Sequence, residues 1–247
     1  MDRLIYTAMT GAKHAFLQQA GVAHNLANVS TVGYRSMEHT FRAVPVLGEG
    51  MPTRAFVVDA SVADDFTQGP LMATGRPLDV AVQGPGWIAV ETANGGEAYT
   101  RAGNLQVNAN GQLQTASGLN VLGDSGPITL PPDNRVTISP DGTVSAVPVF
   151  GVPNNVTAVG RIKLVNPPES QLVRGDDGLF RQKNGQPADP DANVKLAPGT
   201  LEGSNVNPVD AMVNMISLAR QFEMQIKMLQ TADSDARAAT QLLTINR

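Results

Sequence analysis

Apolar residues recur at steps of three and four near both ends of the chain, and this repeat constrains the fold more than any other feature. Near the N-terminal end the repeat lies within residues 3–28 and comprises Ile5, Met9, Ala12, Phe16, Ala23 and Leu26. Near the C-terminal end it follows Pro208 and comprises Met212, Met215, Ala219, Phe222, Ile226 and Leu229. Heptad spacing of this kind is typical of helices that bury one face against another helix. We therefore predict a coiled-coil-like helix at each end of the chain.

The C-terminal helix has a predictable start. Pro208 suits the first turn of a helix, because a backbone N–H would have no intrahelical partner there. Asn205 and Asn207 are both candidates for the N-cap, since a side-chain oxygen at that position accepts hydrogen bonds from the first free N–H groups. If it continued to residue 244, the helix would be about 55 Å long, which exceeds the span of a small domain.

Between the two ends, short runs of alternating apolar and polar residues are separated by turn sequences. Asn110-Gly111 and Pro140-Asp141-Gly142 each interrupt such an alternation, and a third hairpin is predicted from the runs 87–91 and 99–101. Asn-Gly supplies the positive φ angles of a tight hairpin turn. Strands at this density predict a mainly β protein whose core is an antiparallel β barrel or sandwich, flanked by the terminal α-helices.

The chain is predicted to have three parts. These are an N-terminal helix and the turn after it over residues 1–41, a β-rich central domain over 42–207, and a C-terminal helix over 208–247. The formal net charge of the whole chain is −4. The central part contributes all of this negative charge, with 11 basic and 16 acidic residues. The ends are nearly neutral, as expected of helices that bury a face.

Composition and motif spacing exclude most kinds of functional site. The chain has no cysteine, which excludes disulfide scaffolds, thiolate metal sites and cysteine nucleophiles. A net charge of −4 is unsuited to nucleic-acid binding. The histidines His14, His24 and His39 do not have the spacing of a zinc-binding helix. We therefore predict no catalytic residue, cofactor, metal ligand or small-molecule substrate.

Adjacent acidic residues leave one enzymatic alternative open. A glycosidase needs two carboxylates that face each other across a cleft, and sequence alone cannot place them. Because the central part is acidic, a periplasmic carbohydrate-active enzyme that uses Asp176 and Asp177 is the competing hypothesis. A cytoplasmic β-rich binding module is a third hypothesis, which the terminal heptads disfavour.

The N-terminal segment does not have the pattern of a cleaved signal peptide. Asp2 and Arg3 lie at its front, Lys13 lies inside it, and no apolar block of about 7–15 residues precedes a small-residue cleavage site. No run of about 18 apolar residues occurs elsewhere. We expect a cytoplasmic protein, or one that is exported without a cleaved signal.

Three separate segments carry a recognisable pattern. The first is residues 25–31 with Gly33-Tyr34-Arg35, the second is 76–87 with 99–103, and the third is 201–206 with scattered residues of the C-terminal helix. Together they resemble the axial rod and hook proteins of the bacterial flagellum. The residues that match the family signature are Asn25, Leu26, Asn28, Gly33 and Tyr34.

Within this family, two stretches are most similar to the larger proximal-rod protein, which adjoins the distal rod. They are the opening sequence MDRLIYTAMTGA and residues 42–46. The distal-rod protein is the alternative, because the chain departs from the family pattern at His24 and Pro85.

The resemblance implies a structural role and no enzymatic activity. Members of the family self-assemble through their terminal helices into the tubular rod of the flagellar basal body, which is the drive shaft for motility. It further implies export through the flagellar type III apparatus without a cleaved signal, and a location in the periplasmic portion of the basal body. The expected partners are other proximal and distal rod proteins and the export apparatus, without membrane insertion. The twelve residues of the two heptad repeats are the expected assembly interface.

Overall fold

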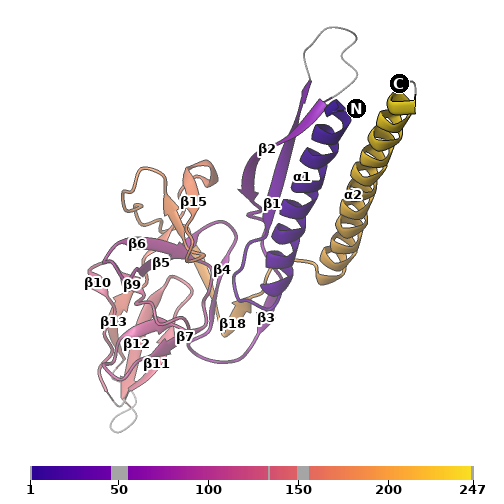
Figure 1. Ribbon diagram of the computed structural model, residues 1–247. Coiled ribbons are helices and arrows are strands. Elements are labelled where there is room, and N and C mark those ends of the chain that lie inside the picture. The colour runs from indigo at the N-terminus through magenta and orange to yellow at the C-terminus, as the bar shows by residue number, and fades with distance from the viewer. Residues whose placement is uncertain (1, 46–54, 133, 149–155, 246–247) are drawn as a thin grey trace. The chain divides into compact units, whose positions relative to one another are not determined.

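The computed structural model describes residues 2–45, 55–132, 134–148 and 156–245. Helix α1 (Asp2–Ala27) and helix α2 (Pro208–Ile245) lie near the two ends, and strands make up most of the rest (Figure 1). The predicted mainly β fold with terminal helices is therefore confirmed. Neither described helix is long and apolar enough to cross a membrane.

The chain divides into two compact units. Unit 1 comprises residues 1–29, 36–65 and 206–247, and unit 2 comprises residues 30–35 and 66–205. The predicted central domain begins at residue 42, inside strand β1 (Met37–Pro45), whereas all of β1 lies in unit 1. A strand pairs over its whole length with its neighbour, so a boundary drawn inside it would break the hairpin that it forms.

In unit 1, α1 lies between α2 and a β hairpin, and the two helices run antiparallel (Figure 1). The hairpin consists of β1 and β2 (Ala55–Asp64), which pair antiparallel from Met37 opposite Asp64 to Pro45 opposite Ala55. Asn207 caps α2, because its Oδ1 accepts a hydrogen bond from the backbone N–H of Val209 at 3.0 Å. Of the two predicted N-cap residues, Asn207 therefore has this role.

Small residues line the seam between α1 and α2. Ala8, Ala12 and Ala15 are buried on α1, and Ala211 and Ala232 are buried on α2. Near the middle of the seam, the rings of Phe16 and Phe222 lie 6.5 Å apart. Alanine side chains let two helices approach closely, so little space remains in the seam for larger groups.

Unit 2 is built from short antiparallel strands. Its largest sheet contains, in spatial order, β14 (Leu164–Val165), β5 (Trp87–Glu91), β6 (Glu97–Thr100), β16 (Phe180–Gln182) and β15 (Leu172–Arg174). A second sheet contains β11 (Asn134–Ile138), β12 (Thr143–Pro148) and β13 (Thr157–Arg161). The other strands form pairs: β3 (Leu71–Ala73) with β18 (Thr200–Glu202), β4 (Val80–Gln83) with β17 (Lys195–Pro198), β7 (Leu105–Val107) with β8 (Leu113–Thr115), and β9 (Leu122–Gly123) with β10 (Gly126–Pro127). One short 3-10 helix, η1 (Glu169–Gln171), precedes β15. The described sheets are open, so of the two predicted cores the sandwich fits.

Strand β5 separates two apolar cores of unit 2. Ile88 and Val90 belong to the larger core, whereas Trp87 and Ala89 belong to a smaller aromatic core. Successive side chains of a strand point to opposite faces, so a strand that is apolar at every position can serve both cores. In the aromatic core, the Trp87 and Phe180 rings lie 4.6 Å apart.

The three predicted hairpins are confirmed. They are the pairs β5–β6, β7–β8 and β11–β12, each antiparallel. In the β7–β8 turn Gly111 has φ +78°, and its N–H donates a hydrogen bond to the carbonyl of Asn108. The Asn-Gly sequence therefore predicted both the turn and the residue with positive φ.

Substitution of Ala12 by leucine is expected to destabilise the helix pair. The added atoms would overpack the seam and lower the free energy of unfolding of unit 1 by about 1–3 kcal/mol. Thermal unfolding followed by far-UV circular dichroism measures this loss. Ala20→Leu on the exposed side of α1 is the matched control. Equal destabilisation by the two variants would contradict the close seam.

Candidate functional site

On α1, the predicted interface residues do not share one environment. Ala12 is buried, and Ile5 and Leu26 are half-buried. Met9, Phe16 and Ala23 are exposed. The seam with α2 also includes Ala8 and Ala15, which the heptad assignment missed because alanine gives a weak periodic signal. The stripe that α1 turns toward α2 is therefore rotated relative to the predicted one.

On α2, most predicted interface residues lie in the seam within the chain itself. Met215, Ala219, Phe222, Ile226 and Leu229 are all half-buried, whereas Met212 is exposed. Gln225, on the same side of α2, lies against Gly11 of α1. The apolar repeat on α2 thus contributes to contact with α1 in the same chain.

A second apolar face lies on the other side of α2, and the heptad assignment contains only one of its residues. We call it the outer face; it comprises Val209, Met212, Val213, Ile216, Met224 and Met228. Their exposed fractions range from 45% at Met228 to 64% at Val209. Residues three and four apart share one side of a helix, so Val209, Met212, Val213 and Ile216 form the first part of a stripe that points away from α1. Met224 and Met228 form its second part, and Arg220 and Glu223 separate the two parts. Large apolar side chains gathered on one exposed stripe are typical of an interaction site.

Three residues of the predicted family signature organise the end of α1. The Asn25 side chain donates a hydrogen bond to the carbonyl of Met37 at 2.8 Å and accepts one from the N–H of Met37 at 2.9 Å. These two bonds fix the first residue of β1 to the helix. The Asn28 side chain donates a hydrogen bond at 3.0 Å to the carbonyl of His24, which also accepts one from the backbone N–H of Asn28 at 3.3 Å. Leu26 lies between these two asparagines in the sequence, and its side chain is half-buried.

The other two signature residues lie in unit 2. The N–H of Gly33 donates a hydrogen bond to the carbonyl of Glu202 at 2.8 Å. Gly33 has φ +69°, and a Cβ at this position would overlap the Arg101 carbonyl group. The Tyr34 carbonyl accepts a hydrogen bond from the N–H of Asn205, and the Tyr34 ring lies 5.1 Å from the Arg174 guanidinium. Only glycine at residue 33 allows this close packing.

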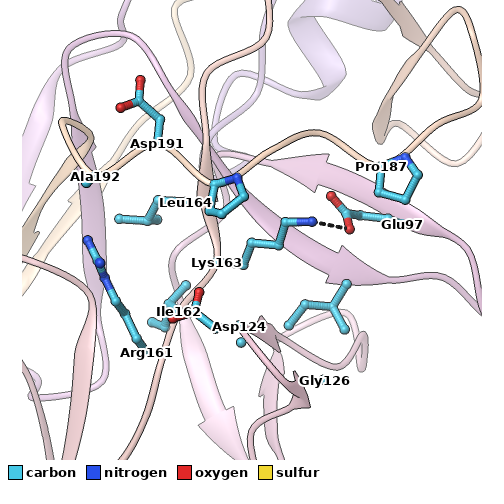
Figure 2. Close-up of a pocket in the computed structure, with 13 residues that line it drawn as sticks. Glu97, Asp124, Gly126, Arg161, Ile162, Lys163, Leu164, Pro187, Asp191 and Ala192 are labelled. Atoms are coloured by element: carbon cyan, nitrogen blue, oxygen red, sulfur yellow. Dashed lines mark hydrogen bonds and ion pairs between the residues drawn. The ribbon is translucent and has the colours of Figure 1, made fainter.

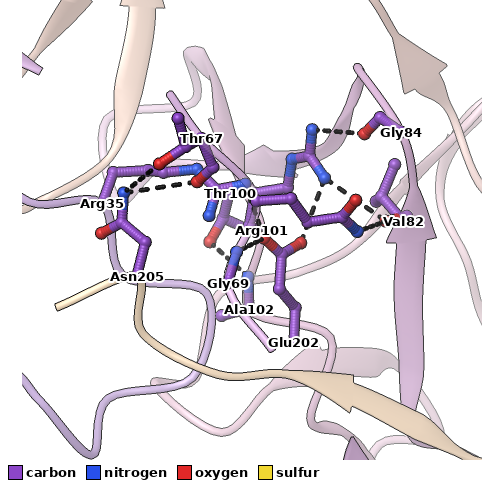
Figure 3. Close-up of polar contacts among 11 residues, drawn as sticks. Arg35, Thr67, Gly69, Val82, Gly84, Thr100, Arg101, Ala102, Glu202 and Asn205 are labelled. Atoms are coloured by element: carbon purple, nitrogen blue, oxygen red, sulfur yellow. Dashed lines mark hydrogen bonds and ion pairs between the residues drawn. The ribbon is translucent and has the colours of Figure 1, made fainter. Parts of the chain in front are cut away.

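A buried carboxylate joins these segments (Figure 3). Glu202 Oε1 lies 2.6 Å from Arg35 Nη2 and accepts a hydrogen bond from the N–H of Gly69 at 3.1 Å. Glu202 Oε2 accepts a hydrogen bond from Arg101 Nη1 at 3.1 Å. The Arg101 Nη2 donates to the Gly84 carbonyl at 2.7 Å, and its guanidinium lies 5.2 Å from the Trp87 ring. The side chains of Arg35 and Glu202 are fully buried.

The electrostatics of this cluster are unusual for a protein interior. Two guanidinium groups share one carboxylate, so the cluster has an excess of one positive charge. Burial lowers the pKa of the Arg101 guanidinium from its ordinary value, and the Glu202 carboxylate opposes that shift. Because buried charges are costly unless they are paired, the cluster requires all three side chains in place.

The residue types and spacing of these three side chains indicate no shared role. Arg35, Arg101 and Glu202 each belong to a different one of the three segments that carry the family resemblance. The sequence offered one signal for such a role, which is a charged residue inside a segment that is otherwise mostly apolar or rich in glycine. Only the fold shows that the three side chains meet.

Unit 2 also contains a pocket with charged side chains of both signs (Figure 2). Arg161, Lys163, Asp124 and Asp191 line it, together with Glu97, which accepts a hydrogen bond from Lys163 Nζ at 2.7 Å. Among the described residues, no group of three or more His, Cys, Asp or Glu side chains is placed to hold a metal ion.

The acidic pair considered for catalysis lies in a turn before β16. Asp177 forms a two-point ion pair with Arg181, whose Nη1 donates to Asp177 Oδ1 at 2.9 Å. This hydrogen bonding holds the pKa of the Asp177 carboxyl below its ordinary value. A carboxyl group that stays ionised cannot act as the general acid of a glycosidase at neutral pH. Asp176 is exposed.

Replacing Glu202 by glutamine is expected to destabilise unit 2 strongly. The substitution keeps the shape but leaves two buried guanidinium groups without their carboxylate, so the free energy of unfolding should fall by about 3–5 kcal/mol. Trp87 is the single tryptophan, and its fluorescence during urea unfolding reports on unit 2. Asp177→Asn, which breaks an exposed ion pair, is the control and should cost at most about 1 kcal/mol. Similar losses in both variants would refute the special role of Glu202.

A comparison of two fragments tests the predicted domain boundary. Residues 30–205 contain Arg35 and Gly33, whereas residues 42–207 do not. We expect the longer fragment to unfold cooperatively at a higher temperature, because Glu202 keeps both of its arginine partners. Arg35→Ala in the longer fragment should remove the difference. Equal unfolding temperatures of the two unsubstituted fragments would show that residue 42 is an adequate boundary.

Three protein-family models match the chain in the order of the three segments. "Flagella basal body rod protein" matches residues 5–35, "Flagellar hook protein FlgE/F/G D1 domain" matches 81–146, and "Flagellar basal body rod FlgEFG protein C-terminal" matches 197–242. Arg35, Arg101 and Glu202 each fall within a different one of these matches.

Curated relatives match over almost the entire length. The chain is 46% identical to the flagellar basal-body rod protein FlgF of Salmonella typhimurium and 46% identical to that of Escherichia coli, with 100% of each chain covered. It is 32% identical to the flagellar basal-body rod protein FlgG of Agrobacterium fabrum, with 95% of this chain and 97% of the relative covered. The chain therefore belongs to the flagellar basal-body rod protein family.

Proposed function

We propose that this chain is a structural subunit of the proximal part of the flagellar rod, and that it assembles through the outer face of α2. The observation that carries the proposal is the exposed apolar stripe from Val209 to Met228. Full burial of a valine, isoleucine or methionine side chain contributes roughly 1.5–3 kcal/mol. A second chain that covers the stripe would therefore gain a substantial part of its binding free energy there.

The proposed interface includes predicted residues that remain exposed. Met212 belongs to the outer face, and Met9, Phe16 and Ala23 of α1 are exposed, Phe16 beside Phe222 of α2. The half-buried residues of the predicted set, such as Ile226, would act by holding α1 and α2 together. Contact between this surface and a different surface of the next subunit does not close on itself, so it produces a filament. The neighbours would be further copies of this chain and other proximal and distal rod proteins.

Several observations support the proximal-rod assignment over the distal one. Identity to relatives named FlgF ranges from 31% to 46%, whereas identity to two relatives named FlgG is 32% and 30%. The opening segment and residues 42–46 are also most similar to the proximal-rod protein.

We further infer that the chain reaches the periplasmic portion of the basal body through the flagellar export apparatus, without cleavage of a signal. Residues 2–27 form α1, whose buried alanines form the seam with α2. Removal of this segment would expose the inner side of α2. We infer no enzymatic activity, and the ion pair between Asp177 and Arg181 argues against use of that carboxylate as a general acid.

Ile216→Asp is expected to abolish rod assembly without unfolding the subunit. Ile216 is 57% exposed, so a charge there should leave the fold intact but would have to be desolvated in the assembled rod. The measurement is swimming and isolation of basal bodies from a deletion strain that expresses the variant. Asn214→Asp, which adds a charge at another exposed position of α2, is the matched control and should support swimming. Normal motility with Ile216→Asp would rule out the outer face as the interface.

A further inference from the structure

Half of the apolar outer face of α2 is methionine. Met212, Met224 and Met228 have exposed fractions of 53%, 60% and 45%. The chain has no cysteine, so no thiol in it competes for oxidants. Exposed thioethers are therefore the most readily oxidised side chains of this surface.

We propose that Met212, Met224 and Met228 form an oxidation site that controls whether the subunit can assemble. The proposal rests on the proposed function, because it assigns a regulation to the outer face. Oxidation of an unassembled subunit makes its outer face more polar, so that neighbouring subunits cannot bury this face. Subunits already in the rod are protected, because the same side chains are buried there.

The reaction needs only a peroxide. The thioether sulfur attacks one oxygen of hydrogen peroxide, a sulfur–oxygen bond forms, and the oxygen–oxygen bond breaks. The products are one methionine sulfoxide and one water for each peroxide consumed, so the sulfur is oxidised by two electrons and the peroxide is reduced. A methionine sulfoxide reductase reverses the change.

The sulfoxide would alter the surface chemically without changing its size much. It replaces an apolar, flexible side chain with a polar one that accepts hydrogen bonds. Burial of such a group against an apolar neighbour leaves its oxygen without a partner, which opposes association. Each of the three sulfoxides would oppose association, and their unfavourable contributions to the binding free energy would add.

The chain provides two internal comparisons. Met215 lies three residues from Met212 on the same helix, but it is half-buried toward α1. Met72 is 48% exposed, but it lies on β3 and belongs to unit 2, whereas both helices belong to unit 1. Met215 therefore tests the effect of exposure on oxidation, and Met72 tests the effect of location on assembly.

The first experiment maps oxidation in the purified, unassembled full-length chain. It is treated with hydrogen peroxide, and sulfoxide at each methionine is followed by peptide mass spectrometry. We expect Met212, Met224 and Met228 to oxidise about tenfold faster than Met215, and Met72 to oxidise as fast as they do. Equal rates at Met215 and the three outer methionines would overturn the proposal.

The second experiment tests the consequence for assembly in a deletion strain. Met212, Met224 and Met228 are replaced together by leucine, which keeps the face apolar, or by glutamine, which mimics the polarity of the sulfoxide. We expect the leucine variant to swim normally and the glutamine variant to lose swimming and the rod. Met72→Gln should swim. A glutamine variant that swims normally would overturn the proposal.

A comparison of the outcomes separates this proposal from the proposed function. If Ile216→Asp prevents assembly but the glutamine variant assembles, the outer face is the interface and only the oxidation proposal fails. If both variants assemble, the outer face is not the interface and both proposals fail. Circular dichroism of the purified variants establishes that each of them is folded.

Discussion

The Glu202 carboxylate, held between Arg35 and Arg101, is the interaction on which unit 2 depends. A buried carboxylate is tolerated only when its oxygens are paired, and here each oxygen has a guanidinium partner. The same residue accepts a hydrogen bond at its backbone carbonyl from Gly33. Segments that begin the chain, lie near its middle and precede the last helix are thereby joined at one residue. Trp87 of the aromatic core lies against Arg101.

The ends of unit 2 are organised by this junction. The chain leaves unit 2 after Arg35 and again after Asn205. Arg35 is held by Glu202, and Asn205 donates hydrogen bonds to Tyr34 and Thr67. An ion pair and hydrogen bonds within unit 2 therefore hold both residues at which the chain leaves this unit.

Helix α2 places its apolar side chains in a way that suits a subunit rather than a monomer. Buried positions toward α1 include the small residues Ala211 and Ala232, whereas Val209, Ile216 and Met224 remain exposed. A chain that functions alone would gain more free energy by burying the larger side chains. Under the proposed function, another chain covers the outer face and the arrangement becomes favourable.

The sequence by itself determined the local elements of this protein. The heptad repeats predicted α1 and α2, Asn110-Gly111 predicted a hairpin, and three segments in a particular order were sufficient to indicate the family. These features depend on neighbours in the chain. The tertiary structure alone decided which face of α2 meets α1, because alanines such as Ala8 and Ala15 bear no strong periodic signal. It alone also brought Arg35, Arg101 and Glu202 together, because the free energy of pairing buried charges depends on residues that are far apart in sequence.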